Sequence, residues 1–301
     1  MTNHMRPPYP WFGGKRKAAD LIWTRLGDVA NYIEPFLGSA AILLMRPSEP
    51  KIETVNDADA MIANFWRAIR ADPMTVAMHA DHAVIEADLH ARHRFLITRK
   101  PMVREQCMAD PEWFDAKIAG WWVWGLSQWI GDGWVPDRAP AQHGKIPYLK
   151  GGSHANIKGF HEAGIYAWFE ALQVRLRRVR VCSGDWSRIM GESVIHGNGT
   201  TGIVLDPPYD GFANVYSDGT EIFSQVAKWA TDHGQDPRLR IALCGYEGSF
   251  TAPDGWETVE WKANGGYGNT SGNMNAHKER IWFSPACLKV NRPQQRSLFG
   301  P

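Results

Sequence analysis

The chain has 301 residues, and its 33 basic and 32 acidic side chains leave a formal net charge of only +1. This balance excludes a protein that is basic all over, so any surface for a polyanion must be local. The sequence has no secretory leader, no apolar stretch long enough to span a bilayer and no cysteine spacing typical of metal ligands, so we expect a soluble intracellular protein without a metal site.

A glycine turn followed by an amphipathic helix is predicted near the N-terminus. Trp11-Phe12-Gly13-Gly14-Lys15 precedes apolar residues at helical spacing, namely Ala18, Leu21, Ile22 and Leu26. The two glycines permit a ligand to approach the backbone closely where the helix begins. Lys15 is then either part of a ligand site or a surface lysine at a helix start.

Two strand-to-helix turns are predicted next. The segment Tyr32-Ile33-Glu34-Pro35-Phe36-Leu37-Gly38-Ser39-Ala40 is typical of a strand, a tight turn and the start of a helix. A second short strand is predicted over 52–55, and Asn56-Asp57 lies directly after it. Rossmann-like sheets commonly hold a nucleoside ribose on a carboxylate at this place. The alternative role for Asp57 is to cap the helix that follows.

The middle of the chain, 71–178, is predicted to be an inserted, mainly helical region. Tryptophans recur at helical spacing from Trp113 to Trp129, which indicates a helical core, although one or two could instead stack on DNA. The stretch 131–159 is rich in Gly, Pro, Lys and His, so it suits a loop laid on a polyanion. The alternative is a solvated surface loop. We assign the DNA contacts in this stretch to Lys145, Lys150, Asn156 and Lys158.

The basic residues at the end of this region, Arg175, Arg177, Arg178 and Arg180, are predicted to complement a helix C-terminus, with phosphate contact as the second choice. Strands are then predicted over 179–182, 202–205, 239–244, 257–262 and 279–284, and a helix is predicted around 222–230. The loop 264–277 is either disordered or becomes ordered over DNA.

Asp206-Pro207-Pro208-Tyr209 follows the buried strand 202–205, where open α/β sheets place their ligands. The carboxylate of Asp206 and the carbonyl of Pro207 can each accept one hydrogen of an exocyclic amine, and Tyr209 can stack on the ring that carries this amine. The alternative is a strand that ends in a Pro-Pro turn, with the aspartate as a helix cap.

Taken in order, these motifs resemble the Dam-type (D12 class) DNA adenine-N6 methyltransferases, which use S-adenosylmethionine. The resemblance rests on Trp11 to Lys15, Glu34 to Ala40, Asn56-Asp57, Ser183-Gly184-Asp185-Trp186, Asp206 to Tyr209, and Glu279-Arg280-Ile281-Trp282. One departure is Ala40, where that family usually has glycine. We expect the methyl group to be tolerated if the local φ is negative, whereas a positive φ would put cofactor affinity in question.

The resemblance implies an α/β fold, with a Rossmann-like methyltransferase sheet that carries helices on both faces. The catalytic domain would comprise 1–70 and 179–290, interrupted by a helical target-recognition lobe over 71–178 and followed by a tail over 291–301. By matching position, Asp206, Pro207 and Tyr209 would be catalytic. The cofactor would contact Trp11, Gly13, Lys15, Glu34, Phe36, Gly38, Asp57, Asp185, Trp186 and Asp206.

The implied activity is methyl transfer from S-adenosylmethionine to N6 of an adenine flipped out of a specific double-stranded DNA sequence. The alternatives are a methyltransferase for another amide or amine, such as a protein glutamine or cytosine N4, and a non-catalytic DNA-binding protein with this fold. We expect a monomer or weak dimer, without membrane attachment, in the bacterial or phage-infected cytoplasm and associated with the nucleoid. Whether it serves a restriction system, a phage or a solitary regulator stays open.

The C-terminal peptide Gln295-Arg296-Ser297-Leu298-Phe299 resembles the short Gln-x-x-Leu-Phe peptides by which bacterial replication proteins dock on the sliding clamp. In such a complex the glutamine would bond at the rim of a pocket while Leu298 and Phe299 fill it. The alternative is that these two side chains fold back onto the protein's own surface.

Overall fold

A computed structural model describes residues 5–11, 14–129, 134–136, 164–208, 219–261 and 279–290. Within these ranges seven strands form one sheet in the order β3-β2-β1-β4-β5-β7-β6. The strands are β1 (Asn31–Glu34), β2 (Ile52–Asp57), β3 (Val179–Ser183), β4 (Thr201–Leu205), β5 (Leu239–Tyr246), β6 (Glu257–Glu260) and β7 (Glu279–Phe283). The strands predicted from the sequence are confirmed, with bounds that differ by a residue or two.

The five strands from β3 to β5 run parallel, whereas β7 runs antiparallel to both β5 and β6. Every residue of β1 and β4 is buried. Burial on both faces explains why β4 appears in the sequence as the short apolar run 202–205 rather than as an alternating pattern. The chain leaves β1 toward β2 on one side, and β4 lies on the other side. The strand order therefore reverses between β1 and β4, and ligands bind at the carboxyl ends of strands at such a point.

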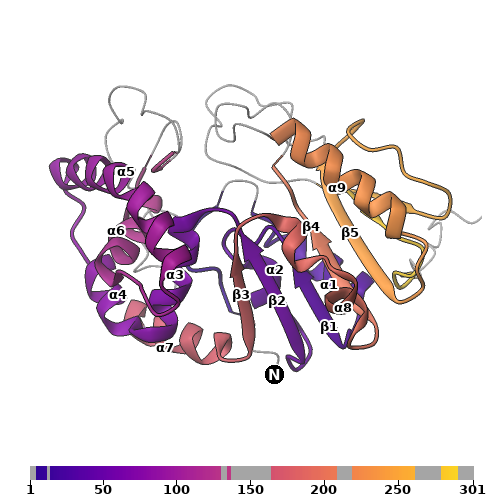
Figure 1. Cartoon of the computed structure of the whole chain (residues 1–301), viewed down its shortest axis with the longest axis horizontal. Coiled ribbons are helices and arrows are strands. Elements are labelled where there is room, and N and C mark those ends of the chain that lie inside the picture. The colour runs from indigo at the N-terminus through magenta and orange to yellow at the C-terminus, as the bar shows by residue number, and fades with distance from the viewer. Residues whose placement is uncertain are drawn as a thin grey trace, which may run out of the picture.

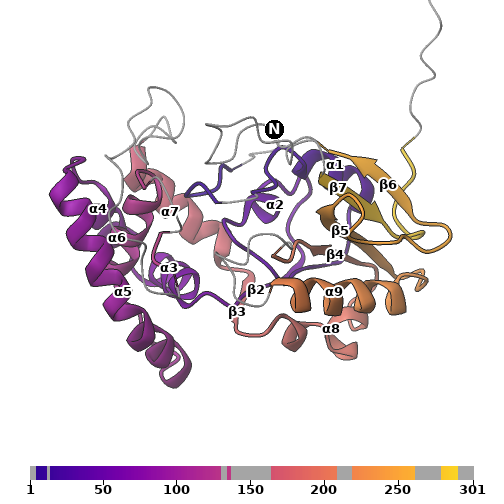
Figure 2. The ribbon, with the colours of Figure 1, turned by 90° about the horizontal axis from the view of Figure 1, so that it is seen from above.

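Helices cover both faces of this sheet (Figure 2). The helices α1 (Ala19–Leu26) and α2 (Ala41–Leu44) lie over one face, and α8 (Glu192–His196) and α9 (Gly219–His233) lie over the other. A short 3-10 helix, η2 (Trp186–Ile189), follows β3. The described residues thus have a mixed α/β fold with a helix-flanked sheet, consistent with the expected Rossmann-like arrangement.

A group of helices gathers beside the edge strand β3 (Figure 1). It comprises α3 (Ala60–Ala71), α4 (Pro73–Ala80), α5 (Glu86–Ala109), α6 (Ala116–Leu126) and α7 (Gly164–Leu176). Trp122, Trp124 and Trp168 are buried within this group, while Trp121 and Trp113 pack against its core and stay partly exposed. The interpretation of the tryptophans as a helical core is therefore confirmed for the described ones. The exact bounds of an inserted region stay a prediction.

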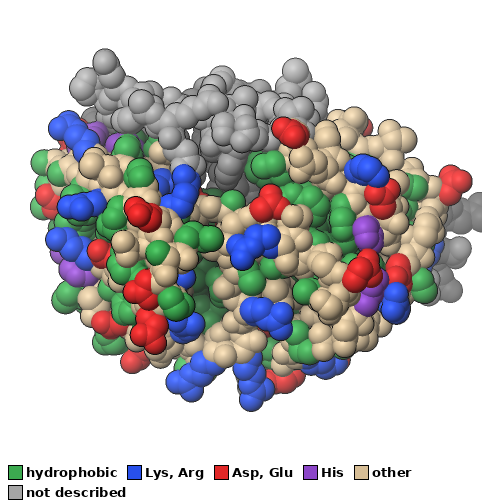
Figure 3. All heavy atoms as spheres, in the orientation of Figure 1, with side chains coloured by type: hydrophobic (Ala, Val, Ile, Leu, Met, Phe, Trp, Pro, Cys, Tyr) green, Lys and Arg blue, Asp and Glu red, His purple; other side chains and the backbone are tan. Residues whose placement is uncertain are grey.

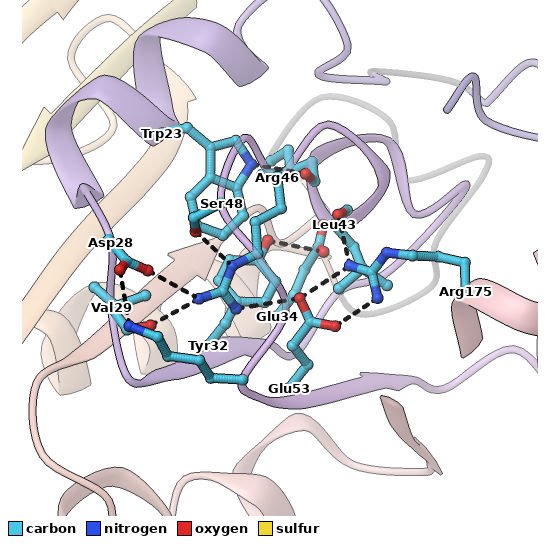
Figure 4. A network of polar contacts seen from close by, with 12 residues as sticks. Trp23, Asp28, Val29, Tyr32, Glu34, Leu43, Arg46, Ser48, Glu53 and Arg175 are labelled. Atoms are coloured by element: carbon cyan, nitrogen blue, oxygen red, sulfur yellow. Dashed lines mark hydrogen bonds and ion pairs between the residues drawn. The ribbon is translucent and has the colours of Figure 1, made fainter. Parts of the chain in front are cut away.

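Buried ion pairs attach α7 to the sheet (Figure 4). The carboxylate of Glu53 on β2 accepts two bonds from Arg175 of α7, at 2.6 and 2.9 Å, and a third from Arg46, at 3.2 Å. Nη2 of Arg175 also donates to the carbonyl of Leu43, and Nη2 of Arg46 donates to that of Val29. Arg175 lies in the last turn of α7, where a helix C-terminus was predicted, but its guanidinium also ties the helical group to β2, so the second choice, phosphate contact, is wrong for this residue.

The neighbouring arginines, Arg177, Arg178 and Arg180, are exposed. On the face shown in Figure 3, lysine and arginine side chains are scattered and interspersed with acidic ones. None of the helices in the described ranges is both long and apolar enough to cross a membrane.

Candidate active site at the carboxyl ends of the strands

Acidic side chains stand at the carboxyl ends of four neighbouring parallel strands. Glu34 ends β1, Asp57 ends β2, Asp185 follows β3 and Asp206 follows β4. Because these ends meet at one edge of the sheet, the side chains that the sequence places far apart are brought to one side of the molecule. These four predicted residues come from four separate segments of the chain and lie at one edge of the sheet.

The turn after β1 is built around Gly38, which has a φ of 48°. Its amide donates to Oδ2 of Asp57 at 2.9 Å, and its carbonyl accepts the hydroxyl of Tyr9 at 2.7 Å. A Cβ at this position would lie 2.6 Å from the ring of Trp11, so the indole packs directly on the glycine. Both the positive φ and the close approach of Trp11 therefore require glycine here.

Ala40 also adopts a left-handed conformation, with φ 59° and ψ 27°, and is fully buried. It stands immediately before α2, and its carbonyl accepts from the amide of Leu44 at 3.0 Å. A left-handed conformation costs a residue with a Cβ roughly 1–2 kcal/mol. The expectation that the methyl group is tolerated at a negative φ therefore does not apply, and α2 begins under local strain.

Asp57 accepts hydrogen bonds from two backbone amides, those of Gly38 and Asp59, each at 2.9 Å. Burial raises the pKa of its carboxyl to about 6, although these amides work in the opposite direction. The side chain that caps α3 is Asp59, which accepts from the amide of Met61. The alternative role of Asp57 as the helix cap is therefore wrong, and its carboxylate instead orders the turn after β1.

Asn56 connects this turn to the end of β3. Its Nδ2 donates to the carbonyls of Pro35 and Gly184, at 3.1 and 2.9 Å. Its Oδ1 is buried and has no hydrogen-bond partner among the described residues. The sequence motif contains Asn56, but sequence reasoning gave it no role because a buried cross-link of two loops leaves no local pattern.

Glu34 lies deeper than the other carboxylates. It accepts the hydroxyl of Tyr32 at 2.9 Å, and burial raises its pKa to about 8. Phe36, two residues further, is stacked against Trp186 with ring centroids 6.1 Å apart. The turn from Glu34 to Gly38 thus rests on a protonatable buried group and on an aromatic contact.

Asp185 is exposed and caps η2 by accepting from the amide of Ser187 at 2.9 Å. Trp186 is buried and packs against Phe36. One face of the indole is therefore already occupied by a ring of this protein. The structure places both residues next to the Gly184 loop that Asn56 holds.

Lys15 is buried, with 3% of its surface exposed, so the alternative of a surface lysine is wrong. Its Nζ lies 3.0 Å from Oδ1 of Asp206 and 3.9 Å from Oε2 of Glu279. Burial alone lowers the pKa of an ammonium group, but the nearby Asp206 and Glu279 carboxylates outweigh burial, so the pKa of Lys15 is raised. Lys15 therefore stays charged between these two carboxylates.

Glu279 is a member of this cluster that sequence reasoning did not assign to the site. It begins β7 and lies opposite Tyr246 of β5. Burial raises the pKa of its carboxyl to about 7, the ammonium of Lys15 lowers it and Asp206 raises it again. The one available signal was the Glu279-Arg280-Ile281-Trp282 motif, in which an acidic residue opens an apolar strand.

Pro207 is buried and Pro208 is half-buried, so the backbone after Asp206 runs along the site. Several predicted site residues lie outside the described ranges, namely Gly13, Lys145, Lys150, Asn156, Lys158 and Tyr209. The stretches 137–163 and 262–278 and the C-terminal peptide lie outside them as well. In the described part of the chain no group of His, Cys, Asp and Glu side chains is arranged to hold a metal ion.

The family model of the D12 class N6 adenine-specific DNA methyltransferases matches residues 11–114. No curated protein matches the chain. The matched range contains the Trp11 turn, β1, β2 and the helices through α5, and it ends before α6 and before Asp206. The resemblance to Dam-type adenine methyltransferases is therefore confirmed, and it supports a methyltransferase that acts on adenine in DNA.

Proposed function

We propose that this chain, with its D12-class segment over 11–114, transfers a methyl group from S-adenosylmethionine to N6 of an adenine in a specific double-stranded DNA sequence. The observation that carries the proposal is the position of Asp206. It stands at the carboxyl end of β4, next to the point where the strand order reverses, and a buried lysine holds its carboxylate.

The residues at the ends of β1 and β2 fit the proposed cofactor. The carboxylate of Asp57 is held by the amide of the positive-φ turn at Gly38, and a carboxylate at this place is the acceptor that ribose hydroxyls require. The buried Oδ1 of Asn56, which lacks a partner, is a further acceptor at the same edge. When bound, S-adenosylmethionine supplies an electrophilic methyl group on a sulfonium.

We assign the cofactor contacts by position. Asp57 would accept from the ribose hydroxyls, and the turn from Glu34 through Phe36 to Gly38 would surround the methionine part. Trp11, Gly13 and Lys15 would lie near that part as well. Asp185 would accept from the adenine amine of the cofactor, with the Trp186 segment beside that ring.

The chemical role of Asp206 is to orient a weak nucleophile. The lone pair of adenine N6 is delocalised into the ring, so acceptance of its two hydrogens by Asp206 and the Pro207 carbonyl favours tetrahedral character at nitrogen. The carboxylate also stabilises the positive charge that develops on N6. Alignment of the two reactants can contribute up to about 7–11 kcal/mol.

The target adenine must leave the helix to reach this site, because N6 is not accessible in line within a base-paired duplex. Base flipping costs a few kcal/mol of lost stacking. Tyr209 would offset part of this cost by stacking on the extruded base. We assign sequence reading to the region 71–178, with phosphate or base contacts from Lys145, Lys150, Asn156 and Lys158.

The proposed setting is the bacterial or phage-infected cytoplasm, with DNA as the partner of a monomer or weak dimer. The peptide from Gln295 to Phe299 would add a weak contact to the sliding clamp, which would concentrate the enzyme on new DNA. Pull-down with the clamp, comparing the full chain with one that ends at Pro293, decides this contact. Equal retention of both, or of neither, would remove it.

Mass spectrometry of nucleosides from duplex DNA incubated with the protein and S-adenosylmethionine tests the function. The proposal expects N6-methyladenine. Methylated cytosine, or methylated protein with unmodified DNA, would favour the alternative substrates. A failure to bind S-adenosylmethionine in calorimetry would favour a non-catalytic DNA-binding role.

A further inference from the structure

The position of the Lys15 ammonium is set by two carboxylates that compete for it. Nζ lies 3.0 Å from Asp206 and 3.9 Å from Glu279, and it also lies 5.5 Å from the ring centroid of Trp261. A movement of about an ångström toward β7 would exchange the closer partner. Because Lys15 is almost fully buried, it cannot turn to solvent instead.

One carboxylate oxygen of Glu279 accepts no hydrogen bond from the described residues. This oxygen, Oε2, is buried, and the side chain is 8% exposed. The backbone beneath it is fixed, because Glu279 pairs with Tyr246 across the sheet and its carbonyl accepts from Nη1 of Arg280 at 3.0 Å. Oε2 faces the Lys15 ammonium at 3.9 Å, beyond hydrogen-bond distance, and a buried carboxylate oxygen without a hydrogen bond is costly, so its retention calls for a function.

The contact between Lys15 and Asp206 conflicts with the proposed chemistry. Asp206 must accept a hydrogen of N6 and stabilise a growing positive charge there. An ammonium 3.0 Å from the same carboxylate neutralises it and repels that charge. The step therefore requires the ammonium to shift to another carboxylate within the cluster.

We propose that Glu279 is the positioning residue that takes the Lys15 ammonium from Asp206 when the target adenine enters. No covalent bond changes in this exchange. Lys15 keeps its proton, Asp206 exchanges one N–H donor for another, and Glu279 gains a hydrogen bond from the ammonium that it already faces at 3.9 Å. This inference rests on the proposed function, and it gives Glu279 a role that neither a fold contact nor the cofactor site requires.

The exchange works only when Glu279 is ionised, so it depends on pH. The groups that act on its charge are Lys15 before α1, Asp206 after β4, and Cys244 and Tyr246 on β5. On the adjacent strand β6, Glu260 pairs with Arg280, the residue next to Glu279. Burial raises the pKa values of the Cys244 thiol and the Tyr246 hydroxyl, so both stay neutral near pH 7. Ionisation of Glu279 near pH 7 would release its proton to solvent.

The test compares single-turnover methyl transfer to duplex DNA, at saturating S-adenosylmethionine and from pH 6 to 9, in the wild type, Glu279→Gln and Glu260→Gln. Glu260 is a matched control, because it lies on the adjacent strand β6 and is exposed. We expect the wild-type rate to rise through pH 7 and the Glu279→Gln rate to be about 10²-fold lower without that rise. Binding of the cofactor by calorimetry should be unchanged in both variants.

Glu279→Asp, which keeps the charge but shortens the reach, covers the case in which Glu279→Gln does not fold. Its rate should fall between those of the wild type and the amide variant while the rise through pH 7 persists. Wild-type rates and pH profiles in these variants would overturn the inference. If the wild type itself leaves adenine unmodified at every pH, the proposed function fails, and the exchange at Glu279 falls with it.

Discussion

Two buried ion clusters in this molecule differ in how completely their oxygens are paired. The carboxylate of Glu53 has no exposed surface, and both of its oxygens accept from guanidinium groups of Arg46 and Arg175 (Figure 4). In the second cluster one ammonium, that of Lys15, serves Asp206 and Glu279, and Oε2 of Glu279 lacks a hydrogen-bond donor among the described residues.

We interpret the fully paired Glu53 cluster as a structural contact and the incompletely paired Lys15 cluster as part of the candidate site. A fully paired buried carboxylate has only one favourable arrangement, so the Glu53 cluster holds α7 against β2. An incompletely paired cluster can rearrange at small cost when a new donor arrives, and perturbed carboxyl groups of this kind gather at functional sites. Glu279 shows the perturbation in a pKa raised to about 7 by burial.

The largest expected effect is the loss of methyl transfer in Asp206→Ala. Removal of the main acceptor for N6 should lower the single-turnover rate at least about 10³-fold. The fold should persist at reduced stability, because the buried ammonium of Lys15 loses its nearest counter-charge but keeps Glu279 as a second one. Quenched-flow or discontinuous assays with a labelled methyl donor measure the rate, and circular dichroism checks the fold. Near-normal turnover would contradict the assignment of Asp206.

The second expected effect is a loss of stability in Glu53→Gln. Two buried guanidinium groups would lose their counter-charge, so the free energy of unfolding should fall by about 3–5 kcal/mol. Asp28→Asn is the control, because Asp28 contacts the same Arg46 at 3.8 Å but is exposed and should cost less than about 1 kcal/mol. Urea unfolding measures both. If both variants lost the same small amount of unfolding free energy, the Glu53 cluster would not be what holds α7 against β2.

The third prediction concerns cofactor binding and pH. Asp57 must be ionised to accept from ribose hydroxyls, and burial raises its pKa to about 6. Affinity for S-adenosylmethionine should therefore be independent of pH above about pH 6. Below it, the affinity should decrease with a limiting slope of about tenfold per pH unit, because Asp57 must lose a proton before the cofactor binds. Calorimetry between pH 5 and 8 measures this. Asp57→Asn should bind more weakly and without this dependence; an unchanged pH profile in the variant would assign the titration to another group.

The raised pKa of Glu34 makes the stability of the fold depend on pH. A carboxyl whose pKa is higher in the folded than in the unfolded protein contributes stability at low pH and loses it as pH rises through the folded value. For Glu34 that loss is expected up to about pH 8, where burial places its pKa. Glu34→Gln should remove this slope from the pH dependence of the unfolding free energy.

The smallest effect is expected at Ala40, whose φ is 59°. Ala40→Gly should raise the free energy of unfolding by up to about 1 kcal/mol, because relief of the left-handed strain exceeds the extra entropy of the unfolded chain. Ala41→Gly, one residue later and inside α2, should instead lower it by about 1 kcal/mol. Thermal unfolding of the two variants gives the comparison, and a loss in both would show that Ala40 is unstrained.

Most of the fold could be predicted because its central strands are buried on both faces. Runs such as 202–205 and 241–244 are continuous and apolar, and each is followed by a polar or glycine residue. The positions of Glu34, Asp57 and Asp206 then followed from one rule, that ligands bind at the carboxyl ends of parallel strands.

The parts that escaped prediction depend on contacts between distant segments. β7 inserts between β5 and β6, so its first residue, Glu279, reaches Lys15 from the far end of the chain. Arg175 finds Glu53 across 122 positions of sequence. The left-handed backbone at Ala40 also escaped prediction, because the packing of the turn, and not the amino acid type, decides the sign of φ there.

The central claim is that the cluster around Asp206 methylates adenine at a specific DNA sequence. Sequencing of DNA with detection of N6-methyladenine, from cells that express the wild type or Asp206→Ala in a host lacking this modification, tests it most directly. The account predicts N6-methyladenine at one recurring sequence in cells with the wild type and at none with the variant. Unmodified adenine with the wild type, or equal modification with both proteins, would contradict it.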